Sequence, residues 1–150
     1  MTPTIVNKLY NIFSGYHISG DITGCYCDLC LSKEYSDYLT STALDKFENH
    51  DFVAYLTSGD ILNSNANDFK YFLPRLLEIA YKTLGELDDF NYHIWTVLAR
   101  TNHQDWPIDE QKVLQQFARE YLDKAETIND CEILENARLD IKEANIKLSD

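Results

Sequence analysis

The sequence predicts an all-α protein, a single-domain irregular bundle of about six to eight helices over residues 1–150. Three observations predict this class. Apolar residues recur at helical spacing along most of the chain. The 150 residues include only 5 glycines and 3 prolines, which disfavours a turn-rich β fold. A content of 45% hydrophobic and 25% charged residues is ordinary for one globular domain of this length.

The N-terminal part of the chain is predicted to hold three short helices. Ser32 is suited to cap the second of them, on which we expect Tyr35, Tyr38 and Leu39 to face inward. The predicted segments are a helix over residues 4–13, a loop over 14–31, a helix over 33–40, a turn over 42–47 and a helix over 51–57.

The strongest helical pattern lies in the middle of the chain. Asn67 is a suitable N-cap, Gly85 a suitable C-terminal residue, and Pro74 interrupts the run. Because the apolar stripe keeps its phase across Pro74, the pattern favours a kink over two abutting helices. The stripe consists of Phe69, Phe72, Leu73, Leu76, Leu77, Ala80 and Leu84.

Arg75 lies in this central helix, which is otherwise apolar on its inner face. Glu78 follows three residues later and is within reach of it. We therefore predict that Arg75 is partly buried and anchors a carboxylate or loop carbonyls.

Three more helices are predicted in the last third. Asp89 can cap a helix over residues 90–100, and Trp106-Pro107 opens a long one. The last begins at Asn129 or Asp130, and its narrow apolar stripe needs a partner helix. Three aromatic residues lie off the main stripes and are candidates for an interface: Tyr71, Tyr92 and Trp95.

The formal net charge is −12, with a pI near 4.6. This charge argues against partners such as nucleic acids and anionic membranes, and it fits a basic protein partner. It is also typical of proteins whose charge serves only solubility. Residues 86–150 hold 15 acidic and 7 basic groups, against 10 and 6 in residues 1–85. The candidate partner-binding residues are Asp105, Asp109, Glu110, Glu120, Asp123, Glu126, Glu132 and Glu135.

Three of the four cysteines form a C-x-C-x2-C cluster: Cys25, Cys27 and Cys30. Three thiolates this close can coordinate one soft cation, so a zinc ion is possible and these three are its candidate ligands. The fourth ligand is open among His17, Asp28, His50, His103 and Cys131. A packed turn of reduced thiols and a redox sensor are the alternatives.

The sequence contains none of the common catalytic signatures. It has no G-x-S-x-G, P-loop, G-x-G-x-x-G or H-E-x-x-H pattern, so we expect a binding protein without a cofactor and not an enzyme. We find no signal-peptide pattern and no apolar run long enough to span a membrane, so we expect a cytoplasmic location.

Part of the chain resembles a group of uncharacterised bacterial helical proteins. The resemblance covers roughly residues 15–125 and rests on a cysteine-rich turn at 24–27, the Gly59-Asp60 step, and the F-L-P-R-x-L-E motif at 72–78. Some acidic helical proteins of this size are immunity proteins of contact-dependent growth inhibition systems. The resemblance implies that this chain neutralises a basic nuclease-type toxin domain by blocking its active site. The alternative function is a metal- or redox-responsive regulatory domain that uses Cys25, Cys27 and Cys30.

Overall fold

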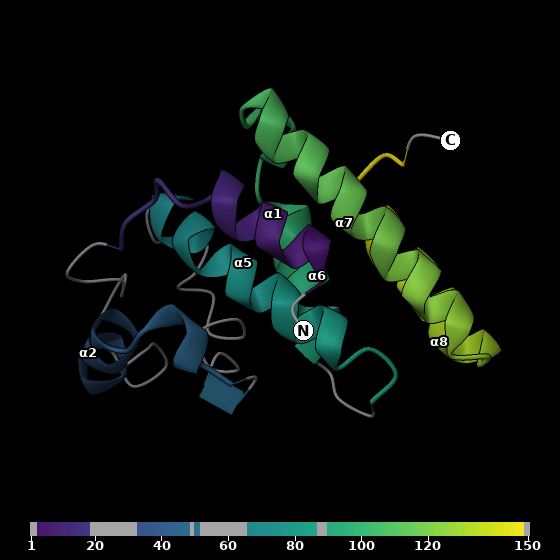
Figure 1. Cartoon of the computed structure of the whole chain (residues 1–150), viewed down its shortest axis with the longest axis horizontal. Helices are drawn as coiled ribbons and strands as arrows, with labels where there is room; N and C mark the ends of the chain where they lie inside the picture. The colour runs from purple at the N-terminus through teal and green to yellow at the C-terminus, as the bar shows by residue number, and fades with distance from the viewer. Residues whose placement is uncertain (1–2, 19–32, 49, 52–65, 87–89, 149–150) are drawn as a thin grey trace.

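The structure is a computed structural model that describes residues 3–18, 33–48, 50–51, 66–86 and 90–148. These residues form helices and turns with no β-strand among them, so the predicted all-α class is confirmed. The predicted helix over 51–57 and most of the predicted loop over 14–31 lie outside the described residues. The elements in Figure 1 are α1 (Thr4–Ile12), α2 (Lys33–Ser41), η1 (Leu44–Lys46), α5 (Ala66–Lys82), α6 (Phe90–Arg100), η2 (His103–Asp105), α7 (Ile108–Thr127) and α8 (Cys131–Glu143), where η marks a 3-10 helix.

Helix α5 is the central element and carries the predicted stripe. It runs through Pro74 as a single helix, so of the two predicted outcomes two abutting helices are wrong. It begins at Ala66, one residue before the expected cap, so Asn67 lies in its first turn. The apolar stripe lies on both sides of Pro74, and α5 packs against α1 and α6. Its fully buried members are Phe72, Leu73, Leu76, Leu77 and Ala80.

Helix α1 packs against two helices that lie far from it in the sequence. It contacts α5 and α7, and Figure 1 shows it alongside both. Ile5, Val6 and Leu9 have no exposed surface, which confirms the predicted helix over residues 4–13. The N-terminal helix therefore joins the middle of the chain to its last third.

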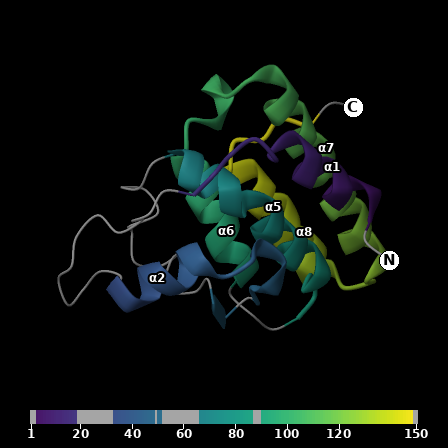
Figure 2. The ribbon, with the colours of Figure 1, turned by 60° about the vertical axis from the view of Figure 1, so that its left-hand side comes forward.

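Helix α2 and the short η1 lie at the edge of the molecule (Figure 2). Leu39 is buried as predicted, but Tyr38 is exposed, and its hydroxyl donates a 3.0 Å hydrogen bond to Asp51. Tyr38 was expected to face inward, but it lies at the surface, where its ring meets that of Phe47 edge-on at 5.8 Å. After η1, Phe47 is fully buried and packs edge-to-face on Phe72 of α5.

Helices α7 and α8 form a hairpin, and α8 also packs against α6. Pro107 precedes α7, as the sequence predicts. The turn between the two helices places Asn129 at φ +61°, and the Asp130 carboxylate accepts hydrogen bonds from the amides of Glu132 and Ile133. Asp130 is therefore the cap of the last helix, and α7 and α6 supply the partner helices that its narrow stripe requires.

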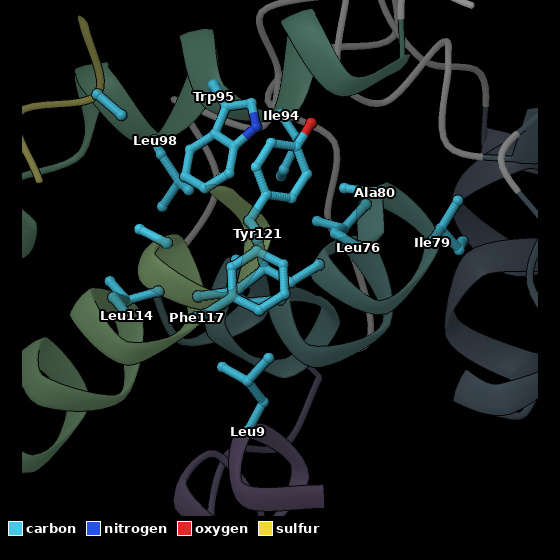
Figure 3. Packing of buried hydrophobic residues seen from close by; sticks show 14 of the residues in the cluster. Leu9, Leu76, Ile79, Ala80, Ile94, Trp95, Leu98, Leu114, Phe117 and Tyr121 are labelled. Carbon is cyan, nitrogen blue, oxygen red and sulfur yellow. The ribbon is translucent and has the colours of Figure 1, made fainter. Parts of the chain in front are cut away.

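Trp95 of α6 lies in the centre of the core. Its side chain is 1% exposed, and its ring lies 5.1 Å from that of Tyr121 and 6.1 Å from that of Phe117 (Figure 3). The prediction that Trp95 is an interface residue is wrong, because α6 packs on more than one neighbour and buries more than its main stripe. Of the other two candidates, Tyr71 is half-buried and Tyr92 is exposed.

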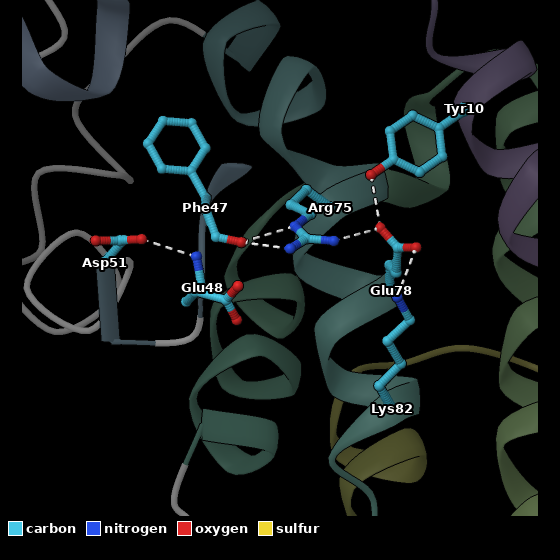
Figure 4. Close-up of polar contacts among 7 residues, drawn as sticks. All are labelled: Tyr10, Phe47, Glu48, Asp51, Arg75, Glu78 and Lys82. Atoms are coloured by element: carbon cyan, nitrogen blue, oxygen red, sulfur yellow. Dashed lines mark hydrogen bonds and ion pairs between the residues drawn. The ribbon is translucent and has the colours of Figure 1, made fainter. Parts of the chain in front are cut away.

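Arg75 is buried and structural, as predicted. Its Nε and Nη2 donate to the Phe47 carbonyl at 2.8 and 2.5 Å, and its Nη1 donates to Glu78 Oε1 at 2.8 Å (Figure 4). The Tyr10 hydroxyl also donates to Oε1, and Lys82 lies 3.2 Å from Oε2. Burial opposes ionisation of Glu78, but the hydrogen bonds from Arg75, Tyr10 and Lys82 outweigh it and lower the pKa of this carboxyl. The network connects α1, η1 and α5.

Candidate protein-binding surface

The predicted partner-binding carboxylates lie on η2, α7 and α8. Helices α7 and α8 are neighbours, so most of these charges share one part of the molecule. Glu120 is only half-buried and lies 3.3 Å from the amide nitrogen of Gln116. Six of the eight candidates are exposed: Asp105, Asp109, Asp123, Glu126, Glu132 and Glu135. Their exposure leaves these carboxylates accessible to a cationic partner.

Glu110 is a correction to that set. It is 5% exposed, and its carboxylate lies 2.7 Å from Lys70 Nζ and accepts a hydrogen bond from the Tyr16 hydroxyl. The Lys70 ammonium also lies over the Trp106 ring, 4.5 Å from its centre. Burial opposes the charge on Lys70, but the bonds to Glu110 and Tyr16 outweigh it and raise the pKa of the ammonium. We expected Glu110 to face outward. Its partner Lys70 lies 40 residues away in the sequence, and local spacing does not reveal such a contact.

Two cationic side chains near the acidic surface, Arg138 and Lys124, already have partners within the protein. Arg138 is 4.0 Å from Glu126, and both side chains are largely exposed, so water screens this pair. Lys124 donates to the Tyr81 carbonyl, and its ammonium lies 4.5 Å from the centre of the Tyr81 ring. Arg138 therefore offsets part of the charge of Glu126, whereas Lys124 is held by Tyr81.

A cavity of about 410 Å³ opens between the turn after α5 and helices α6, α7 and α8. Two large apolar side chains on its lining are exposed: Tyr92 by 53% and Leu139 by 49%. Tyrosine is enriched among the residues that contribute most to protein interfaces, and Leu139 adds exposed apolar surface beside it. The lining residues are Leu84, Gly85, Glu86, Asn91, Tyr92, Tyr121, Ile133, Asn136, Ala137, Leu139, Asp140 and Glu143.

Asp140 is the half-buried carboxylate of this cavity. Burial, together with the nearby charge of Glu143, raises the pKa of its carboxyl to about 6. Asn91 donates a 3.0 Å hydrogen bond to the hydroxyl of Tyr121, another lining residue. Burial, with the charge of Asp140 adding to it, raises the pKa of that phenol to about 12, so Tyr121 is neutral at ordinary pH. The cavity thus has a polar lining that includes a carboxylate partly removed from water, that of Asp140.

A second cavity, of about 650 Å³, has lysines and no carboxylates among its described lining residues. It opens between η2, α7 and the segment after α8, where His103 Nε2 lies 2.6 Å from the Ala144 carbonyl oxygen. Glutamine, asparagine and lysine side chains supply most of its polar lining, including Lys142 and Lys147. A cation that binds the first cavity through its carboxylates should therefore not bind this second one. We call the first one, lined by Glu86, Asp140 and Glu143, the acidic cavity.

The predicted metal site falls outside the described residues. Cys25, Cys27 and Cys30 all belong to the segment over 19–32, and zinc binding by them stays a prediction that elemental analysis tests. Cys131 is an exposed, free cysteine at the start of α8. Within the described part of the chain, no group of three histidine, cysteine or carboxylate side chains is arranged to hold a metal.

Sequence reasoning missed Asp140, Leu139 and Glu86. One signal was available for Asp140, which lies three residues after Ala137 and beside Ile141, at the border of the apolar stripe of α8. Because α8 packs against both α6 and α7, this border position is half-buried. The cavity itself depends on three helices and a turn, and no local pattern shows that they meet.

Comparisons with known protein families, with curated proteins and with solved structures find no match to this chain. Among the helices of the described residues, none combines the length and the apolar character that a bilayer crossing requires.

Proposed function

We propose that this protein is an immunity protein that binds a basic, nuclease-type toxin domain and blocks its active site. The observation that carries the proposal is the set of six exposed carboxylates on η2 and the neighbouring helices α7 and α8. Carboxylates in this arrangement can occupy the positions at which a nuclease's lysines and arginines hold phosphates. Opposite charges also accelerate the encounter, which favours rapid capture of the toxin.

Charge reversal on the two helices tests this function. The double variant Asp123→Lys/Glu135→Lys places one reversal on α7 and one on α8, both at exposed positions. Asp45→Lys/Glu48→Lys makes the same change in net charge on exposed residues of η1 and the segment after it. If a basic nuclease-type domain is encoded by a neighbouring gene, cells that produce it are scored for growth, and binding of the purified proteins is measured at 50 and 300 mM NaCl.

Wild type and the Asp45/Glu48 variant should protect the cells, and the Asp123/Glu135 variant should protect them poorly. Association of wild type should slow at the higher salt concentration, because the Debye length is only ~10 Å at 0.1 M and shorter still at 300 mM. Full protection by a folded Asp123/Glu135 variant would place the binding site elsewhere. Failure of wild type to protect against the toxin would contradict the function itself.

A further inference from the structure

We propose that the cavity lined by Tyr92, Leu139 and Asp140 receives an arginine side chain of the partner protein. This inference rests on the proposed function and names the position at which the partner is anchored. The cavity lies between α6, α7 and α8, adjoining the acidic helices, and its volume of about 410 Å³ is within the range of ligand-binding pockets.

The charges of the cavity favour a cationic occupant. Three carboxylates line it, from Glu86, Asp140 and Glu143, and none of the described residues that line it is a lysine, arginine or histidine. Lys124 interacts electrostatically with Glu86, but its ammonium is bonded to the Tyr81 carbonyl. An incoming cation would therefore meet Asp140 and Glu143, for which no ion pair is found among the described residues, and Glu86, which Lys124 offsets in part.

The state of Asp140 supports the same conclusion. Its carboxylate is partly removed from water and lies near the like charge of Glu143, and both effects make ionisation unfavourable. A cation placed against Asp140 would reverse that cost, since attraction between opposite charges is stronger in a site that excludes water. Binding of a cation and ionisation of Asp140 therefore favour each other.

The apolar side chains select arginine over lysine. The guanidinium is planar, can bind a carboxylate through two parallel hydrogen bonds, and stacks on aromatic rings. Tyr92 provides an exposed ring, and Leu139 provides aliphatic surface for the methylene groups of the side chain. A lysine ammonium is a compact, strongly hydrated charge, and it would use neither surface as well. Arginine is also enriched among the residues that contribute most to protein interfaces.

A titration followed by amide NMR spectra of the full chain tests the inference with defined probes. The probe is Nα-acetyl-arginine amide at pH 7.5, where Asp140 is ionised. The matched control ligand is Nα-acetyl-citrulline amide, which has nearly the same shape without the charge. The matched protein variants are Asp140→Asn in the cavity and Asp45→Asn, which removes one charge from an exposed residue of η1 outside both the cavity and the acidic helices.

The arginine amide should give saturable shifts at residues 84–86, 91–92 and 133–143, with a dissociation constant of about millimolar order. Asp140→Asn should weaken binding by at least about fivefold, since a charge-assisted pair is lost, and Asp45→Asn should leave it unchanged. Tyr92→Leu, which keeps an apolar side chain but removes the ring, should also weaken it. The residues around His103 and Lys147 should not respond to the arginine amide.

Equal shifts from the citrulline amide, or arginine shifts spread over α7 and α8 without the cavity residues, would overturn the inference. These results are separable from the test of function, because Asp123 and Glu135 lie outside the cavity. Loss of protection by their double reversal without arginine binding would leave the function in place and remove the cavity as the anchor. Arginine binding at the cavity by a protein that protects against no toxin would support the cavity and contradict the function.

Discussion

Arg75 shows how one side chain can hold three elements together. Its guanidinium bonds the carbonyl that follows η1 and the carboxylate of Glu78, which in turn bonds Tyr10 of α1. The group is buried, so its donors and acceptors have little water to replace a lost partner. Removing the guanidinium leaves both the Phe47 carbonyl and the Glu78 carboxylate with fewer hydrogen bonds.

We expect Arg75→Ala to lower the free energy of unfolding by about 2–4 kcal/mol, since it breaks a buried pair and leaves Glu78 with only the exposed Lys82 as a cation. Denaturant unfolding at pH 7 measures it. Lys82→Ala is the matched control because Lys82 pairs with the same carboxylate from an exposed position, and it should cost at most about 0.5 kcal/mol. Equal losses in the two variants would show that burial does not determine the contribution of the Glu78 pairs.

The raised pKa of Asp140 should make the free energy of unfolding fall as pH rises, whereas a carboxylate with a lowered pKa makes it rise. Its folded-state pKa of about 6 lies above the ordinary value of 3.8, so the native state binds the proton more tightly than the unfolded chain. Stability from this group is therefore present at low pH, is lost as pH rises from about 4 to 6, and stays lost above that. Glu143 and Tyr121 are the titratable groups coupled to it.

Asp140→Asn should therefore stabilise the protein by about 1 kcal/mol at pH 7.5, an amount reduced by solvent screening of the half-exposed side chain. The gain should shrink at pH 4.5. Denaturant unfolding at the two pH values measures it, with Glu135→Gln as the control for the change in net charge. A gain that is independent of pH would mean that packing, and not ionisation, is responsible.

At the scale of elements, the turn after α5 depends on a single glycine. Gly85 has φ +97°, and a Cβ atom built there would lie 3.2 Å from the Cδ1 atom of Ile128. A side chain at this position is strained by the backbone and crowded by the α7–α8 turn. This contact is one reason why the two turns lie close together beside the acidic cavity.

Gly85→Ala should reduce the free energy of unfolding by about 1–2 kcal/mol, the cost of a left-handed conformation for a residue with a side chain. Gly15→Ala is the control, because a Cβ atom there meets nothing within 4 Å, and its effect should stay within about 0.5 kcal/mol. Thermal unfolding of both variants decides the point. A stable Gly85→Ala protein would indicate that the turn can change its conformation without cost.

Local sequence patterns were sufficient to predict the helices that the structure describes, but not which helices pack against one another. The stripe of α5 and the caps at Pro107 and Asp130 depend on residues a few positions apart, so spacing revealed them. Trp95 and Glu110 depend on contacts with residues tens of positions away, and a single helix does not show how many neighbours it has. The exposure of the acidic surface was largely predictable, and the cavity beside it was not.

At the scale of the whole molecule, the net charge of −12 should weaken the fold at low ionic strength. The buried pairs Lys70–Glu110 and Arg75–Glu78 are shielded from salt, whereas the exposed carboxylates of α7 and α8 are not. Added salt should therefore relieve repulsion more than it weakens attraction.

Raising NaCl from 20 to 300 mM should raise the melting temperature by a few degrees, since ~1 kcal/mol corresponds to roughly 4 °C for a domain of this size. Thermal unfolding followed by circular dichroism measures it. The Asp123→Lys/Glu135→Lys variant has less repulsion to relieve and should respond less. A melting temperature that falls with salt would show that attractive surface pairs dominate.

The position of α1 has a consequence for the order of events during synthesis. A ribosome makes residues 4–12 long before residues 108–127 of α7, against which α1 packs. At ~5–20 residues per second, the intervening chain takes roughly 5–20 s to appear. Throughout that interval the apolar side chains of Ile5, Val6 and Leu9 lack one of the two helices that cover them. Until α7 has emerged, α5 is the only one of these two helices that can cover them, so this part of the core closes after the acidic helix has been made.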